Sequence, residues 1–97
     1  MNIEEFREYC IRKPATTEET PFGPDTLVFK VEGKMFALSG MDQFKSINLK
    51  CDPEKALEFR ELYEAVSPGY HMNKKHWNTV EVNKDVSDEL IKQMINH

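Results

Sequence analysis

The sequence has few glycines and cysteines, and it lacks any long apolar run. Its four glycines, at positions 23, 33, 40 and 69, are too far apart for the glycine loops that bind nucleotide phosphates. No segment approaches the roughly 18 apolar residues of a membrane span. Residues 1–5 also lack the basic and apolar regions of a signal peptide. These absences argue against a nucleotide cofactor and a membrane segment, and they predict a cytoplasmic protein.

The cysteines and histidines do not form a recognisable reactive motif. Cys10 and Cys51 lie far apart and neither belongs to a C-x-x-C pair, so two reduced thiols are expected. A cysteine nucleophile would need a nearby imidazole, and no local motif brings either thiol to His71 or His76. The two histidines are five positions apart, a spacing that neither a helix face nor a strand face presents well to a metal ion. We therefore expect no catalytic residue, no metal and no cofactor.

The overall composition is that of one small folded domain. Ninety-seven residues with 39 % apolar content are enough for a single core, so one domain over residues 1–97 is expected. The net charge is −4, but residues 65–80 hold two lysines and no carboxylate, and residues 26–51 hold four lysines against two carboxylates. If both segments lie in one sheet, its open side would be mildly basic and the helical side acidic.

Capping residues predict three helices. Asn2 and Glu5 have the spacing of a capping box, so the first helix is expected to begin at residue 3 and to end before Pro14. Asp52 is the predicted N-cap of a second helix that opens with a proline, and Ser87 is the predicted N-cap of the last. The second helix is expected to bury four residues: Ala56, Phe59, Leu62 and Tyr63.

Alternation of apolar and polar residues predicts an antiparallel sheet. The segments that alternate are 26–31, 35–39, 46–51 and 77–82. The first three should form a meander, with its second turn at residues 40–45. Residues 15–25 are expected to be a loop that Phe22 anchors to the core. The predicted class is α+β, an antiparallel β-sheet with helices packed on one face, in the order α-β-β-β-α-β(-β)-α.

Residues 67–80 have the most unusual composition in the chain. They combine two lysines, two histidines, two asparagines, a tyrosine and the only tryptophan, without a carboxylate. Such a mixture suits polyanions, because cations meet phosphates while rings and amides reach sugars or bases. The candidate nucleic-acid contacts are His71, Asn73, Lys74, Lys75, His76 and Asn78, with Lys30, Lys34 and Lys50 from the predicted strands.

The same segment allows two other interpretations. Tyr70, Met72 and Trp77 could line a pocket or an interface for a small ligand or a protein partner. In the simplest structural interpretation, the lysines occupy a solvated turn, the asparagines cap turns and Trp77 lies in the core.

Motifs along the whole chain carry a family resemblance. They are IEEFREYC at 3–10, PFG at 21–23, LVFKV and GKMFAL within 27–38, NLKCDPE at 48–54 and PGYHMNKKHWNTV at 68–80. In these motifs the chain resembles the MmcQ/YjbR family of small bacterial proteins. The resemblance implies a CyaY-like (frataxin-like) α+β fold and DNA binding through a "double wing" motif.

The frataxin-like fold also suggests iron binding by an acidic first helix, but Arg7, Arg12 and Lys13 offset the carboxylates of that helix here. Family members usually continue past the last helix with a short basic tail, whereas this chain stops at His97. We expect a monomer that is not an enzyme and that binds DNA weakly, without sequence preference and in a salt-dependent way, because few lysines are available for phosphate contacts. An unknown protein partner is the alternative.

Overall fold

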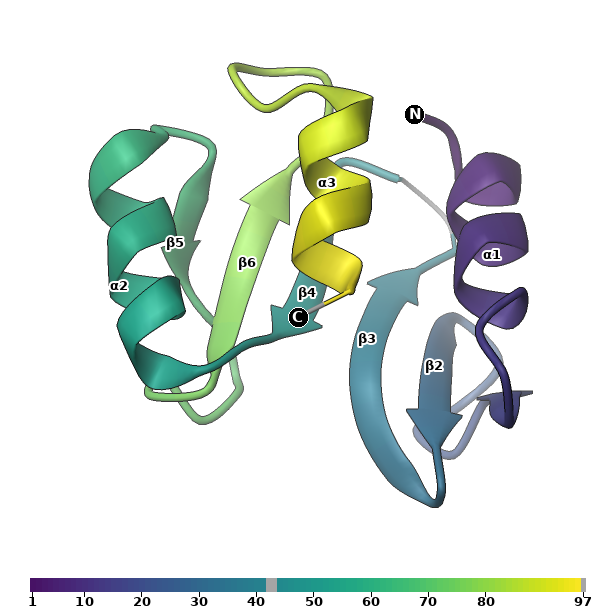
Figure 1. Ribbon diagram of the computed structural model, residues 1–97. Coiled ribbons are helices and arrows are strands. Elements are labelled where there is room, and N and C mark those ends of the chain that lie inside the picture. Colours follow the sequence, from purple (N-terminus) through teal and green to yellow (C-terminus); the bar gives the residue numbers. More distant parts are fainter. Residues whose placement is uncertain (42–43, 97) are drawn as a thin grey trace.

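The computed structural model describes residues 1–41 and 44–96, and within them three helices flank a six-stranded sheet (Figure 1). The helices are α1 (Ile3–Ile11), α2 (Pro53–Leu62) and α3 (Asp88–Ile95). The strands are β1 (Thr16–Glu19), β2 (Thr26–Val31), β3 (Lys34–Gly40), β4 (Ser46–Lys50), β5 (Val66–Pro68) and β6 (Trp77–Glu81). They lie in the order β1-β2-β3-β4-β6-β5, and every neighbouring pair is antiparallel. The predicted α+β class is confirmed.

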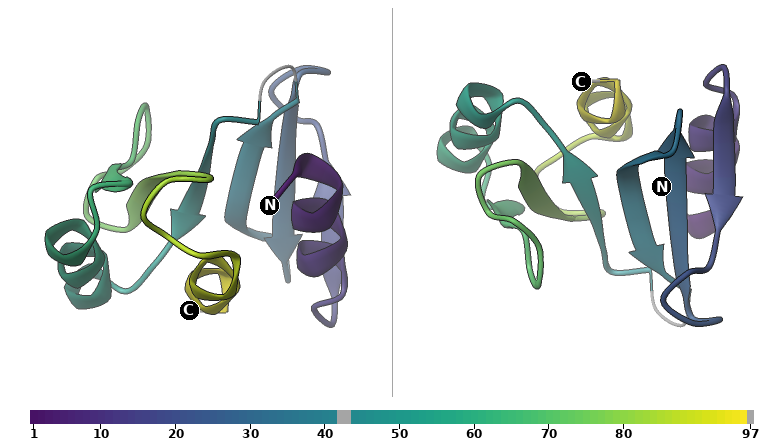
Figure 2. Two further views of the ribbon diagram at one scale, coloured as in Figure 1. Left: turned by 90° about the horizontal axis from the view of Figure 1, so that it is seen from above. Right: turned by 90° about the horizontal axis from the view of Figure 1, so that it is seen from below.

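The strand alternation separates an apolar face from an open face. In β4, Ile47 and Leu49 are buried, whereas Asn48 and Lys50 alternate with them and lie on the opposite face. The helices cover the apolar face, because side chains of α1 and α3 belong to the same buried cluster as those of β4. Figure 2 shows α2 and α3 together on one side of the sheet. Within residues 1–41 and 44–96 no helix covers the other side, and loops and strand side chains form its surface.

The predicted helix starts are confirmed by their capping bonds. The Asn2 side chain accepts a hydrogen bond from the Glu5 amide at 2.9 Å, and the Glu5 carboxylate accepts one from the Asn2 amide at 3.2 Å. Asp52 accepts from the first-turn amides of α2. Ser87 accepts from the Leu90 amide at 3.2 Å. These side chains satisfy amides that the first turn of a helix cannot pair internally.

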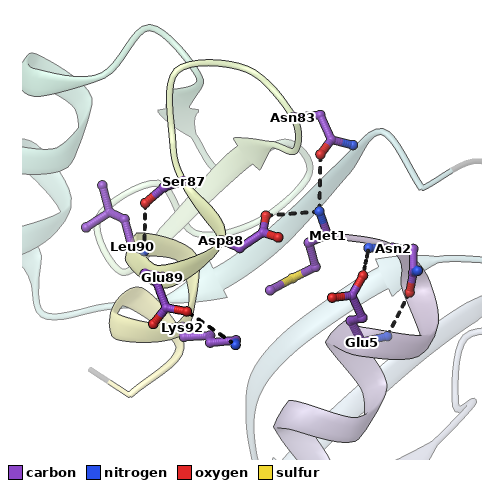
Figure 3. A network of polar contacts seen from close by, with 9 residues as sticks. All are labelled: Met1, Asn2, Glu5, Asn83, Ser87, Asp88, Glu89, Leu90 and Lys92. Carbon is purple, nitrogen blue, oxygen red and sulfur yellow. Dashed lines mark hydrogen bonds and ion pairs between the residues drawn. The ribbon is translucent and has the colours of Figure 1, made fainter.

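Polar contacts join the first and last helices. The amino group of Met1 donates to Asp88 Oδ1 at 2.9 Å and to Asn83 Oδ1 at 3.1 Å, which ties the start of α1 to the start of α3 (Figure 3). At the other end, Asn96 Nδ2 donates to the Tyr9 hydroxyl at 2.6 Å. The two helices therefore lie side by side, with α1 next to β1 and α3 over β4.

The structure corrects several expectations about the edges of the fold. The predicted loop 15–25 contains β1, which pairs with β2, whereas β5 is the optional second strand that the predicted order allowed after α2. Phe22 is 66 % exposed because it lies in the turn beyond β1, so it does not anchor that segment. Leu62 is 64 % exposed because α2 covers only β5 and β6 at the sheet edge, with Ala56 fully buried. Residues 42–43 of the predicted turn lie outside the described residues.

Phe6 is the central core contact of α1, and its removal provides the test of this packing. Its side chain is fully buried, and its ring lies 5.6 Å from those of both Phe29 and Phe44. We expect Phe6→Ala to lower the free energy of unfolding by about 3–5 kcal/mol, because it leaves a cavity under the sheet. Leu57→Ala, at a position 57 % exposed on α2, should change it by less than about 0.5 kcal/mol. Urea denaturation followed by circular dichroism measures both, and equal losses would contradict this packing.

Candidate nucleic-acid interface

Residues 69–76 form a loop between β5 and β6, here called the 69–76 loop. It projects on the side of the sheet away from α2 and α3 (Figure 2). Its first residue must be glycine, because a Cβ there would lie 2.7 Å from Trp77 Cβ. The Gly69 amide donates to the Trp77 carbonyl at 2.9 Å, so the two ends of the loop lie side by side. His71 then turns the chain with a φ of +59°, a conformation that few non-glycine residues adopt.

Arg60 of α2 holds this loop in place. Its Nε donates to Asn78 Oδ1 at 2.6 Å, and its terminal nitrogen donates to the carbonyls of Lys74 and Trp77. The Asn78 amide in turn donates to the Ala56 carbonyl at 3.1 Å. One guanidinium thus links the helix, the first residues of β6 and the far side of the loop. Arginine suits this role because its planar fork donates several hydrogen bonds in fixed directions.

The loop also closes on itself through its own polar groups. Lys74 Nζ donates to the Gly69 carbonyl at 3.0 Å. Asn73 Oδ1 accepts from the Lys75 amide at 2.9 Å, and the Asn73 carbonyl accepts from the Trp77 amide at 3.0 Å. Asn73 therefore caps a turn, as the structural interpretation of the sequence expected. These bonds give the loop a defined shape in the free protein.

The candidate residues divide by their exposure. The exposed ones are Lys34, Lys50, Tyr70, His71, Asn73, Lys74 and Lys75, and the half-buried ones are Lys30, Met72 and His76. Trp77 is 6 % exposed and Asn78 is 2 % exposed. The side-chain amide of Asn78 already bonds to Arg60 and to the Ala56 carbonyl. It therefore joins the sheet to α2 and is not available to a ligand. Tyr70 points outward while Trp77 is buried, so these rings do not line a common pocket.

Four exposed lysines lie toward one end of the strands. The β2–β3 turn and the 69–76 loop both lie at the lower end of the molecule in Figure 1. Lys34 begins β3 at this turn, and Lys50 pairs with Trp77 at the base of the loop. We call Lys34, Lys50, Lys74 and Lys75 the basic end. A depression of about 380 Å³ lies beside it, lined by Phe36, Lys50, Cys51, Asp52, Pro53 and His76.

On the open face, an ion pair offsets the charge of one lysine that the charge pattern singled out. Lys30 Nζ lies 3.2 Å from Glu19 Oε1, and Glu19 comes from β1, a strand that the sequence did not reveal. Hydrogen bonds from Thr17 and then Lys30 lower the pKa of the Glu19 carboxyl, so this carboxyl is ionised at neutral pH. The positive charge of Lys30 is therefore offset by the carboxylate of Glu19.

The buried thiols do not contribute to this surface. Burial raises the pKa of Cys10 to about 12, and it also raises the pKa of Cys51. A thiol with such a pKa is almost entirely protonated at neutral pH, and the thiolate is the reactive form. Over residues 1–41 and 44–96, no group of three or more histidine, cysteine, aspartate or glutamate side chains could hold a metal ion. Within the same residues no helix is long and apolar enough to cross a bilayer.

The architecture is that of a small α+β protein with a six-stranded antiparallel sheet, and comparison with known proteins gives its family. A family model described as YjbR matches residues 11–97, so the chain belongs to the YjbR family. The predicted family is confirmed.

Relatives and solved structures agree with this membership. The chain is 30 % identical to the uncharacterized protein YjbR of Escherichia coli (strain K12) over 96 residues, which cover 98 % of this chain and 81 % of that protein. It is 47 % identical to the uncharacterized protein YbdF of Escherichia coli O157:H7 over 77 residues, 78 % of this chain. The matched region spans 63 % of YbdF, less than two thirds of its length. These names assign no activity.

Two solved structures share the fold. The crystal structure of Deinococcus radiodurans protein DR2400, with a DUF419 domain, matches with a TM-score of 0.90 and 37 % identity over 97 % of this chain and 72 % of that one. A Pseudomonas syringae protein matches with a TM-score of 0.79 and 32 % identity over 99 % of this chain and 94 % of that one. At these identities and TM-scores the likeness is one of the overall fold.

Burial of the thiols should be visible as low reactivity. We expect both cysteines to react slowly with the thiol reagent DTNB at pH 8 in the folded protein and quickly in denaturant. A Cys51→Ala variant isolates Cys10, whose pKa of about 12 predicts the slower reaction. Reaction of native Cys10 at the rate of a free thiol would contradict its burial.

Loss of the Arg60 anchor should loosen the 69–76 loop. Arg60→Lys keeps the charge but cannot reproduce the three-way bonding, so we expect trypsin to cut after Lys74 or Lys75 at least about fivefold faster under native conditions. Fluorescence of Trp77, the only tryptophan, reports the same change at the loop base. The matched control is Arg12→Lys at an exposed position after α1. Equal cleavage rates in all three proteins would show that Arg60 does not position the loop.

Proposed function

We propose that this chain is a DNA-binding protein that attaches weakly and without sequence preference through its basic end. The observation that supports this is the 69–76 loop, which projects from the sheet with exposed lysines and no carboxylate. Lys50 at the loop base and Lys34 at the neighbouring turn extend the same charge. His71 and His76 add ring nitrogens that can donate to phosphate oxygens.

The number of lysines sets the strength of this binding. Four phosphate contacts give a slope of about −3.6 in a plot of log K against log salt on duplex DNA. The net charge of −4 opposes approach to DNA at long range, so contact depends on the local field of the basic end. We expect dissociation constants of roughly 10–100 µM at low salt, within the range of non-specific binding.

The proposed role is binding, not catalysis, by a single-domain monomer in the cytoplasm. Both thiols are buried and protonated at neutral pH, which leaves no nucleophilic cysteine at this surface. A protein partner on the same loop is the competing role, and exposed Tyr70 is the side chain that would favour it. Capture of a stoichiometric protein that survives nuclease treatment and is lost with the loop lysines would support that competing role.

Fluorescence anisotropy with a labelled duplex of mixed sequence tests the proposal. The double variant Lys74→Glu with Lys75→Glu should weaken binding at least about tenfold at low salt, because two attractive contacts become repulsive. The matched control is Lys84→Glu with Lys92→Glu, which makes the same change in net charge at positions where the lysines already pair with Glu81 and Glu89. No binding at about 100 µM protein, or equal losses in the two double variants, would overturn the proposal.

A further inference from the structure

The 69–76 loop carries an exposed aromatic side chain, that of Tyr70. Tyr70 is 69 % exposed, the highest value among the exposed large hydrophobic side chains of the described residues. Its amide donates to Thr79 Oγ1 at 2.9 Å, which fixes the backbone directly below the ring. The backbone at Tyr70 is therefore held in place by a hydrogen bond to β6.

His71 supports the tyrosine ring from one side. The two ring centroids are 4.0 Å apart with planes tilted by 49°, so His71 limits the freedom of Tyr70 on that side. The result is an exposed aromatic ring, supported by His71, in the same loop as Lys74 and Lys75. Proteins that bind unpaired nucleotides combine aromatic rings with a cationic surface in this way.

We propose that the basic end prefers single-stranded DNA to duplex DNA, with Tyr70 stacking on one unpaired base while Lys74 and Lys75 contact the flanking phosphates. This inference rests on the proposed function and adds the form of DNA that is bound. In a duplex the base faces are already stacked on one another, so the Tyr70 ring can stack on a base only if the DNA duplex opens. An unpaired base offers its face freely, and stacking on one aromatic side chain strengthens binding by roughly 5- to 150-fold.

The charge of the protein does not decide between the two forms of DNA. A chain of net charge −4 is repelled less by a single strand, which has half the charge density of a duplex, but each lysine contact with a single strand also releases fewer counterions. Stacking on Tyr70 therefore carries the preference for single-stranded DNA.

The test compares two probes and three variants by fluorescence anisotropy at about 50 mM salt. The probes are a labelled 12-nucleotide thymidine strand and a labelled 12-base-pair duplex. We expect the wild type to bind the single strand at least about fivefold more tightly. Tyr70→Ala should weaken single-strand binding at least about fivefold and change duplex binding less than twofold, whereas Tyr70→Phe should keep the preference. Phe22→Ala, which removes a ring 66 % exposed in the β1–β2 turn, is the control and should change neither.

Each outcome separates this inference from the proposed function. Equal affinity for both probes, with binding still dependent on Lys74 and Lys75, would overturn the inference and leave the proposed function intact. Equal losses for both probes in Tyr70→Ala would also overturn it, because a loop distortion has that effect. No binding of either probe at about 100 µM would overturn both.

Discussion

The bonds of Arg60 with the base of the 69–76 loop are the constraint on which the proposed binding surface depends. The guanidinium joins α2 to Asn78 and to two carbonyls of the loop region, and Asn78 returns to the helix through the Ala56 carbonyl. In this network the Arg60 side chain bonds to other groups of the protein, whereas an arginine on a helix surface ordinarily faces solvent. The outcome is a projecting loop with a defined shape, so binding does not first have to order it, and less conformational entropy is lost on contact.

Electrostatics in this protein act locally. The chain is acidic as a whole, and on the sheet face β1 supplies a carboxylate that pairs with Lys30. The exposed lysines of the basic end come from β3, β4 and the loop between β5 and β6. Under the proposed function, binding of a polyanion depends on the local field of these lysines, because the net charge of the chain repels it.

The central elements of the fold were predictable from the sequence, whereas its edges were not. Helix caps such as Asn2 and Ser87 and the alternation in β2, β3, β4 and β6 carry strong local signals, and the structure confirms them. β1 reads Thr-Thr-Glu-Glu and β5 reads Val-Ser-Pro, so neither edge strand shows apolar alternation. Edge strands bury little of their surface, and tertiary pairing alone defines them.

Composition singled out residues 67–80 as the candidate site but did not indicate the roles of its members. The absence of carboxylates there could not distinguish exposed Lys75 from buried Asn78. The sequence did not indicate the role of Arg60, because this residue lies among carboxylates on a helix and resembles an ordinary solvent-exposed side chain. Its bonding partners are 14 to 18 residues away along the chain, and only the fold brings them together.

Mapping of backbone amide shifts by NMR during titration with a short thymidine strand tests the central claim most directly. The account predicts that the largest changes fall on residues 69–76 and around Lys34 and Lys50, while amides of α1 and α3 stay unchanged. Changes centred on the helices, or scattered over the molecule without a maximum at this loop, would contradict it.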